Sequence, residues 1–237
     1  MKKIGIMQPY FAPYLGYFSL IKHTDEFILF DTVQFIRHGW IERNRILKQN
    51  DGWLYIQVPL EKFSRETLIK DVIINNEIEW KKKILSQLVI YKKVAPNYYK
   101  VINLINDVFE KEYTSVVHLN KALLEKICEY LCFPKKLPIH SEMGLEIDKV
   151  NSPDEWALNI CKKLGNGITY VNPIGGLDFF DKKKYIDSGI QIHFQKMNLQ
   201  PYNQKRDNFE IGLSIIDVMM FNSVDEINIM LNDFELV

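Results

Sequence analysis

Short apolar runs alternate with longer amphipathic stretches along the chain, as is typical of α/β proteins. The short runs are rich in β-branched and aromatic residues and are interrupted by turn-forming residues. They predict strands at Lys3 to Met7, Phe27 to Phe35, Trp53 to Pro59, Lys70 to Asn75, Ile168 to Asn172 and Ile190 to Phe194. We therefore expect an α/β, Rossmann-like fold, in which a mostly parallel sheet is flanked by helices.

The helical pattern is strongest in the middle of the chain. Three amphipathic segments between residues 78 and 133 repeat apolar positions at helical spacing, and Pro96 separates the first from the second. The lysines at 81 to 83 lie opposite the first apolar stripe, as on a solvated face. The pattern predicts a helical subdomain at 78–133, inserted into an α/β core formed by 1–77 and 134–237, in a single compact unit.

Helix starts are marked elsewhere. Residues 17 to 23 fit one or two turns between the first two strands. Ser152, Pro153 and Glu155 resemble a capping box with proline at the first helical position, and Ser223 with Glu226 resembles a second one. Tyr185 to Gly189 is typical of a helix end and turn.

Composition narrows the class of protein. The 237 residues are 47% hydrophobic and 25% charged, and 30 basic residues balance 30 acidic ones. This balance predicts neither nucleic acid nor an anionic membrane as the main partner. No run reaches the roughly 20 apolar residues of a membrane span, and the N-terminal apolar run is too short for a signal peptide. We expect a cytoplasmic protein without direct membrane insertion.

Cysteines and histidines show no metal pattern. The three cysteines, at 128, 132 and 161, lie in stretches with helical character and predict reduced thiols in the core. The five histidines have no ligand spacing, so we expect no metal site.

The loop after the first strand, MQPYFAPYLGY at residues 7 to 17, is the most unusual connection. It combines one amide with prolines and rigid aromatic side chains, and loops at the end of a first strand often bind ligands in open α/β sheets. The alternative is an aromatic turn packed under the sheet. The candidate binding residues are Gln8, Tyr10, Tyr14, Gly16 and Tyr17.

A second candidate segment follows the next strand. Asp31 and Gln34 lie near the end of that strand, and residues 36 to 47 then interleave basic residues with tryptophan and asparagine. Arginine binds phosphate or carboxylate through two hydrogen bonds, and tryptophan stacks on a sugar or base. A solvated basic turn is the alternative. The candidates in this segment are Arg37, His38, Trp40, Arg43, Asn44 and Arg45.

A third, weaker candidate is the glycine turn after the strand at Ile168. Asn172, Gly175 and Gly176 would let a ligand approach the backbone closely. The chain has no Walker loop, GxGxxG, GxSxG or HExxH motif. The proline loop with Gly16 is also similar to the first crossover of nucleotidyltransferase-type folds, but the histidines of that signature are missing.

Together, five blocks of the sequence resemble the WbqC-like family from Gln8 to about Asn222. They are MQPYFAPYLGYFSLI, FDTVQF, GWIERNRIL, YVNPIGG and the late GLSIIDVMMFN. The resemblance implies a setting in bacterial O-antigen or other surface-polysaccharide biosynthesis.

The resemblance also implies a reaction, which is N-acyl or aminoacyl transfer, including glycyl transfer, to a nucleotide-linked amino sugar. Asp31 or His38 would be the base, and Asn44, Gln8 or the amides at Gly16 would bind the oxyanion. Arg43 and Arg45 would hold a phosphate group.

No tightly bound cofactor is expected. The co-substrate would be an acyl donor, namely acyl-CoA, an acyl carrier protein or an activated amino acid. Two alternatives stay open: an ATP-using adenylyl transferase or ligase, and a noncatalytic sugar-nucleotide binding protein.

Overall fold

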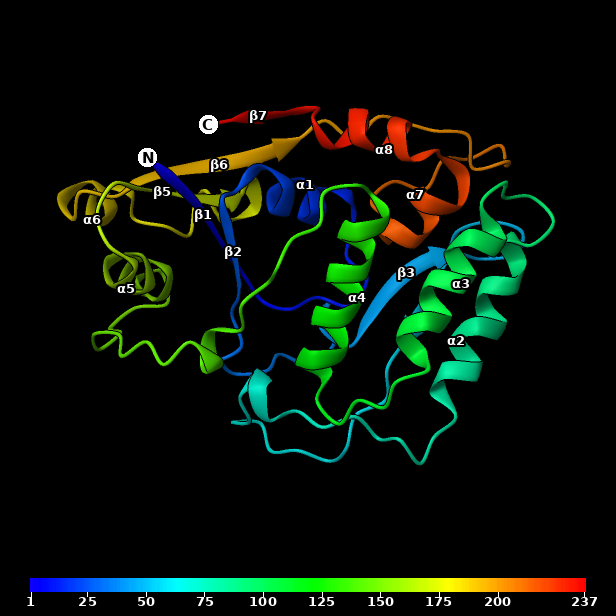
Figure 1. Ribbon diagram of the computed structural model, residues 1–237, viewed down its shortest axis with the longest axis horizontal. Helices are drawn as coiled ribbons and strands as arrows, with labels where there is room; N and C mark the ends of the chain where they lie inside the picture. Colours follow the sequence, from blue (N-terminus) through cyan, green and yellow to red (C-terminus); the bar gives the residue numbers. More distant parts are fainter.

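A five-stranded sheet forms the centre of the computed structural model, which describes all residues from 1 to 237 (Figure 1). The strand order is β2-β1-β5-β6-β7, and only β7 runs antiparallel to its neighbour. The strands are β1 (Lys2–Met7), β2 (Glu26–Leu29), β5 (Ile168–Pro173), β6 (Gln191–Met197) and β7 (Phe234–Leu236). The prediction of a mostly parallel α/β sheet flanked by helices is confirmed, whereas the short β7 was not predicted.

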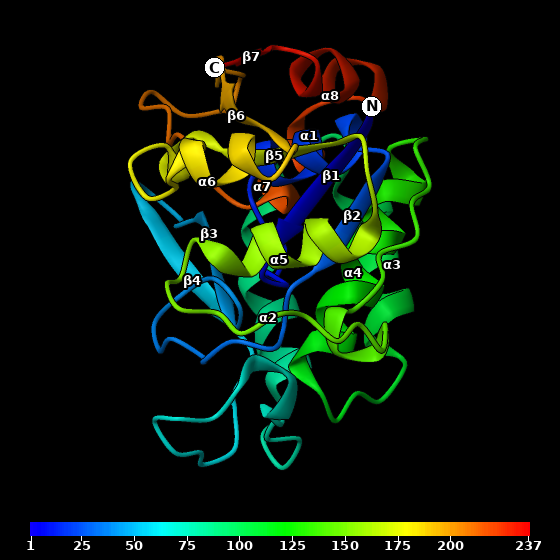
Figure 2. The same cartoon turned by 90° about the vertical axis from the view of Figure 1, so that its left-hand side faces the viewer.

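Two hydrophobic cores lie on opposite faces of this sheet because successive side chains of a strand point to opposite sides. In β1, Ile4 and Ile6 pack in a core of 13 buried residues, while Phe27 and Leu29 of β2 belong to a larger core of 48. The smaller core is covered by α5 (Glu155–Leu164) and α6 (Lys182–Asp187), which lie in front of the sheet in Figure 2. The larger core is covered by α1 (Leu15–His23) and α8 (Val224–Leu231).

The predicted helical middle section is present and extends the larger core away from the sheet (Figure 1). It consists of α2 (Trp80–Leu88), α3 (Tyr98–Phe109) and α4 (Val116–Tyr130). These helices share one buried core with α1, with α7 (Ile215–Phe221) and with the hairpin β3 (Arg43–Leu47) and β4 (Trp53–Gln57). No separate core divides the helical section from the rest of the larger core.

Two strand predictions need correction. The strand predicted over Phe27 to Phe35 ends at Leu29, so Asp31 and Gln34 lie beyond it. Lys70 to Asn75 is not a strand: Ile69–Asp71 forms a 3-10 turn, and Ile73 and Ile74 make only isolated bridges to Ser115 and Leu60. The alternating pattern there reflects a loop in which Val72 and Ile74 are buried and Ile73 is exposed, and which has no neighbouring strand. Residues 43 to 47, for which no strand was predicted, form β3, because Ile46 and Leu47 are buried against the hairpin core.

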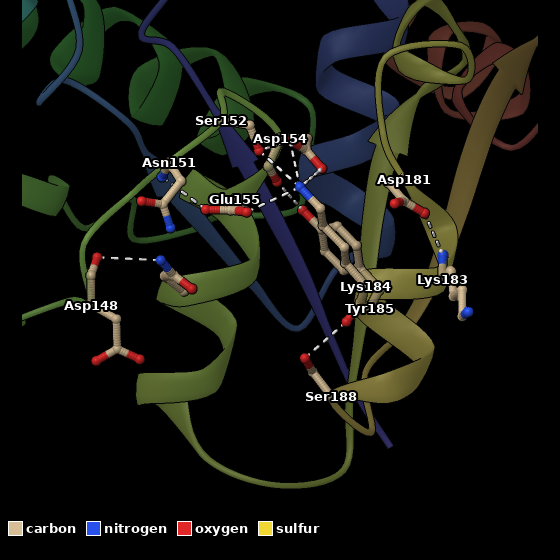
Figure 3. A network of polar contacts seen from close by, with 11 residues as sticks. Asp148, Asn151, Ser152, Asp154, Glu155, Asp181, Lys183, Lys184, Tyr185 and Ser188 are labelled. Carbon is tan, nitrogen blue, oxygen red and sulfur yellow. Dashed lines mark hydrogen bonds and ion pairs between the residues drawn. The ribbon is translucent and has the colours of Figure 1, made fainter.

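The predicted start of α5 is also wrong. Its N-cap is Asp154, whose side chain makes no capping bond, and the helix begins at Glu155 rather than after Ser152. Ser152 and Glu155 instead bind Lys184 of α6, at 2.8 and 3.0 Å from its Nζ (Figure 3). The second predicted capping box, Ser223 with Glu226, is confirmed at the start of α8.

The cysteine prediction holds for two of the three residues. Cys128 and Cys161 are buried, and burial raises the pKa of each thiol to about 12. Cys132 is exposed, contrary to expectation. It follows the end of α4 at a φ of 63°, where the chain leaves the helix.

Candidate functional site

The order in which strands are added to the sheet reverses between β1 and β5. The candidate site lies at the carboxyl ends of these two strands. From β1 the chain adds β2 on one side, and later β5 and β6 are added on the other. The helices that follow these strands leave in opposite directions and open a crevice at such a switch point. Gln8 follows β1, and Asn172 lies near the end of β5.

The first cavity opens on the α5 side of this edge and has a volume of about 960 Å³. Most of its wall is apolar or aromatic, including Phe30, Trp156, Phe179 and Phe180. Its wall contains no Asp, Glu, Lys, Arg or His side chain. The polar side chains that reach it are Gln8, Tyr10, Thr32, Gln34, Tyr170 and Asn172. A cavity of this character suits an apolar or flat ligand group with few polar contacts.

The second cavity lies on the other side of the same edge and measures about 530 Å³. Its wall combines Trp40, Arg45 and the glycine turn at 175 and 176 with Tyr10, Tyr14 and Asn44. Met7, Tyr10 and Asn172 line both cavities. The two spaces therefore meet over the ends of β1 and β5.

Arg45 is the charged side chain of the second cavity. Its Nη2 donates to the Gly212 carbonyl at 3.1 Å, and its guanidinium lies 5.5 Å from the Trp40 ring and 5.2 Å from the Trp53 ring. The Arg45 Nε is buried and has no partner. The side chain is thus held in place by aromatic faces, and it keeps donor capacity for a phosphate or carboxylate.

Asn172 is fixed at the junction of the cavities. Tyr170 donates its hydroxyl to Asn172 Oδ1 at 2.8 Å, and Asn172 Nδ2 donates to the Pro173 carbonyl at 2.9 Å. A Cβ atom at Gly176 would lie only 2.2 Å from that Nδ2, whereas one at Gly175 would meet nothing within 4 Å. Gly176 therefore allows the turn to close over Asn172.

The aromatic loop contributes several residues to the cavity walls, and buried residues of the same loop support them. Tyr10 lines both cavities, and its ring centroid lies 5.5 Å from that of buried Tyr17. The Tyr17 hydroxyl donates to the Gln8 carbonyl at 2.8 Å, which fixes the backbone beside the first cavity. The Tyr14 ring lies where a Cβ of Gly16 would be, so this glycine admits the ring rather than a ligand. Burial raises the pKa of Tyr10, Tyr14 and Tyr17, so all three stay neutral.

Two predicted amides lie at the cavities with partners already in place. Asn44 Nδ2 donates to the Phe11 carbonyl at 3.0 Å, and Asn44 Oδ1 accepts from the Arg45 backbone at 2.8 Å. Gln34 lies at the exposed rim of the first cavity, where its Nε2 donates to the Arg65 carbonyl at 2.5 Å.

Besides Gly16 and Tyr17, four more predicted residues lie outside both cavities. Asp31 is buried, and its two oxygens accept from the Ser141 backbone at 3.0 Å and from the Ser141 hydroxyl at 2.6 Å. Arg43 donates to the His38 carbonyl at 2.5 Å and stacks on Tyr55. Arg37 stacks on Phe63, and exposed His38 lies in the same surface groove. The basic segment therefore brings only part of its side chains to the site.

Several residues at the cavities carried no sequence signal that set them apart. Thr32 lies in the FDTVQF block and lines the first cavity, but only Asp31 and Gln34 of that block were candidate site residues. Trp156 lies near the start of α5 and lines the first cavity. Phe179 and Phe180 follow the glycine turn, and Gly212 comes from a segment more than 30 residues further along. Only the fold brings these segments together.

The structure brings together no group of three or more His, Cys, Asp or Glu side chains that could hold a metal ion. No helix is both long and apolar enough to cross a membrane.

Comparison with known proteins identifies a family for this chain. The model of the WbqC-like protein family matches residues 8–229, which include both the aromatic loop and the glycine turn. The chain belongs to the WbqC-like protein family. It is also 28% identical over 225 residues to a Mycobacterium tuberculosis protein described as uncharacterized protein Rv1507c, with 94% of each chain covered. No solved structure matches this WbqC-like chain.

Proposed function

We propose that this WbqC-like protein is a cytoplasmic N-acyl or aminoacyl transferase that acts on a nucleotide-linked amino sugar. The observation that supports it is the meeting of two cavities of different character at Tyr10 and Asn172. Acyl transfer to an amine needs two different substrates held in contact, with water excluded. The family resemblance suggests surface-polysaccharide biosynthesis as the setting.

The second cavity is the proposed site of the sugar nucleotide. Arg45 has donors for a phosphate oxygen, and Trp40 presents a flat face to a sugar ring or base. The turn at Gly175 and Gly176 permits close approach of the backbone. The amine of the sugar would then point toward Asn172, where the first cavity begins.

The first cavity is the proposed site of the acyl group and its donor. Trp156, Phe179 and Phe180 offer apolar surface, and the mouth of the cavity reaches exposed Ile36. The donor would be an acyl thioester of coenzyme A or of an acyl carrier protein, or an activated amino acid such as a glycyl group. In the reaction the nitrogen–carbon bond forms, the bond from the acyl carbon to its carrier breaks, and the amine loses one proton.

A noncatalytic sugar-nucleotide binding protein is the second candidate, and one observation favours it. Neither cavity is lined by an Asp, Glu or His side chain that could take the proton of the amine directly. This candidate predicts tight binding of the sugar nucleotide without turnover.

Mass spectrometry of the purified protein with nucleotide-linked 3-amino and 4-amino sugars and a panel of acyl donors tests the proposal. A product heavier by one acyl or glycyl unit, formed only with the protein, supports the transferase. Binding without any mass change supports the binding protein. Pyrophosphate release that requires ATP, with no acyl product, supports an adenylyl transferase.

Variants connect the activity to the two cavities. Arg45→Ala removes the charged donor and is expected to raise the KM for the sugar nucleotide by about 10-fold or more. Trp156→Ala is expected to raise the KM for the acyl donor instead. Lys83→Ala, which removes an exposed positive charge on α2 from a residue that lines neither cavity, is the control and should leave both values unchanged. Equal effects of Arg45→Ala and Lys83→Ala would contradict the assignment.

A further inference from the structure

A threonine hydroxyl in the wall of the first cavity is paired with a histidine behind that wall. Thr32 follows β2 and is half-buried at the cavity. Its Oγ1 lies 2.8 Å from His140 Nδ1. A hydroxyl hydrogen-bonded to an imidazole nitrogen is the arrangement that activates serine and threonine nucleophiles.

His140 has the environment of a base rather than of a cation. It is 6% exposed, and its ring contacts Phe30 edge to face at 5.5 Å between centroids. Burial lowers the pKa of this imidazole, although the nearby Asp31 carboxylate opposes the shift. The ring is therefore neutral at pH 7, and one of its nitrogens is free to accept a proton.

The segment that carries His140 is fastened to the end of β2. The Leu29 backbone donates to the Pro138 carbonyl at 2.9 Å, and Ser141 is held by both carboxylate oxygens of Asp31. These bonds fix the imidazole behind Thr32. Asp31 thus acts through His140 as a positioning residue and does not reach the cavity itself.

Groups that could stabilise an oxyanion lie beside the hydroxyl. The backbone N–H groups of Thr32 and Val33 donate to no backbone carbonyl, and both residues line the cavity. The Gln8 side chain lines the same space. A reacting carbonyl near Thr32 Oγ1 would therefore have donors within the same wall.

We propose that Thr32 is a nucleophile that accepts an acyl group from an activated acyl donor, with His140 as its base. Thr32 Oγ1 bonds to the acyl carbon while its proton passes to His140 Nδ1. The bond from the acyl carbon to the carrier sulfur then breaks, and His140 returns the proton to the departing thiolate. This leaves an ester on Thr32.

The fate of that ester rests on the proposed function. An amine at the junction of the cavities attacks the ester carbon, the carbon–Oγ1 bond breaks, and the amine proton returns to Oγ1 through His140. This sequence explains how the site could work without an acid or base side chain exposed in either cavity.

The test uses the full chain and p-nitrophenyl acetate, an activated ester that does not depend on the natural donor. Release of p-nitrophenolate is followed in time, and peptide mass spectrometry locates the acetyl group. The expected result is a burst of one equivalent with the acetyl group on Thr32. Thr32→Val, which preserves the volume of the side chain, abolishes the burst, whereas Thr32→Ser retains it.

His140→Gln is expected to slow acetylation by about 10²-fold to 10⁴-fold. Ser86→Ala, which removes an exposed hydroxyl on α2, is the control and should acetylate Thr32 like the wild type. Circular dichroism identifies any variant that fails to fold, and Thr32→Ser then provides the comparison. An acetyl group on other residues only, no burst in the wild type, or an unchanged rate in His140→Gln would each overturn the proposal.

These outcomes separate the inference from the proposed function. Acetylation of Thr32 without any amino-sugar product would support the nucleophile and contradict the proposed acceptor. Product formation by Thr32→Val at the wild-type rate would support the transferase and overturn the nucleophile.

Discussion

Asp31 is the residue whose role differs most between sequence and structure. The sequence proposes it as a base, whereas the structure places its carboxylate on Ser141 and near His140. Because its negative charge raises the pKa of His140, Asp31→Asn should lower that pKa further below the ordinary value of 6.5. The measurement is an NMR titration of the His140 ring protons. Because His140 then stays unprotonated to a lower pH, the pH at which the acetylation rate of Thr32 begins to fall should also be lower in this variant.

An isosteric change at Ser141 provides the control for that titration. Ser141→Ala removes one hydrogen bond to Asp31 but leaves its charge in place. The pKa of His140 should therefore fall less than in Asp31→Asn. A larger fall in Ser141→Ala would mean that position, rather than charge, determines the pKa.

Gly176 gives a prediction about packing at the site. A methyl group there would overlap the Asn172 amide, so Gly176→Ala should destabilise the protein by about 1–3 kcal/mol. This corresponds to a fall in Tm of several degrees for a domain of this size. Gly175→Ala meets nothing within 4 Å and should change Tm by less than about 2 degrees. Equal shifts in the two variants would show that Asn172 moves freely.

The sequence predicted the site at the level of segments better than at the level of side chains. Tyr10, Arg45, Trp40 and Asn172 line the cavities, because aromatic, arginine and amide residues at strand ends are typical of ligand sites. Arg43 and Arg37 are arginines of the same basic segment, but their side chains stack on Tyr55 and Phe63 outside both cavities. Within the basic segment, β3 puts Arg43 and Arg45 on one side of the strand, yet only Arg45 has Gly212 beside it. The sequence contains no sign of that distant neighbour.

Among the elements, α5 lines the first cavity through Trp156 and Ala157, and Lys184 ties it to α6 (Figure 3). Hydrogen bonds from the Asn151 backbone and Lys184 lower the pKa of Glu155 to about 2. A carboxyl group whose pKa is lower in the folded than in the unfolded state stabilises the fold at every pH above its unfolded-state pKa. This contribution should therefore be lost as the pH falls from about 4.5 toward 2.

Lys184→Met tests this contribution. The variant removes one of the groups that lower the pKa of Glu155, so its stability should fall less steeply than that of the wild type between pH 4.5 and pH 2. Urea unfolding at several pH values measures the difference. Lys183→Met is the matched control because the Lys183 side chain lies outside the Lys184 network and points away from it in Figure 3. An identical slope in Lys184→Met and wild type would contradict the assignment.

Element boundaries followed from sequence where the local signal and the tertiary contacts agreed. Ser223 and Glu226 form their capping box because nothing else competes for them. Ser152 and Glu155 have the same spacing but bind Lys184, which comes from an element nearly 30 residues away. Lys70 to Asn75 alternates like a strand but has no edge to pair with. These failures arise from long-range contacts that a local pattern does not contain.

For the whole molecule, the fold class follows from the sequence because hydrophobic periodicity directly reflects which faces are buried. The strand order does not, since it depends on which crossover connections pack best. That order is what places the aromatic loop after β1 beside the glycine turn after β5. The site was therefore predictable as three segments, and their convergence became visible only in the structure.

The convergence depends on contacts that join the two ends of the chain. Ser214 donates its hydroxyl to the Ala12 carbonyl at 2.7 Å, and its backbone donates to the Arg45 carbonyl at 2.9 Å. Three residues further along the chain, the buried Asp217 carboxylate accepts hydrogen bonds from the Tyr91 hydroxyl, at 2.6 Å, and from the Tyr202 hydroxyl. The start of α7 thus connects the aromatic loop, β3 and the helical section.

Asp217→Ala should therefore destabilise the whole molecule, by about 3–5 kcal/mol, because it leaves several buried donors without an acceptor. Tyr202→Phe removes one donor and should cost about 1–2 kcal/mol. If the two side chains act together, Tyr202→Phe should cost almost nothing in the Asp217→Ala background. Urea unfolding of the four proteins measures this coupling. Additive losses would mean that Asp217 and Tyr202 stabilise separate parts of the chain.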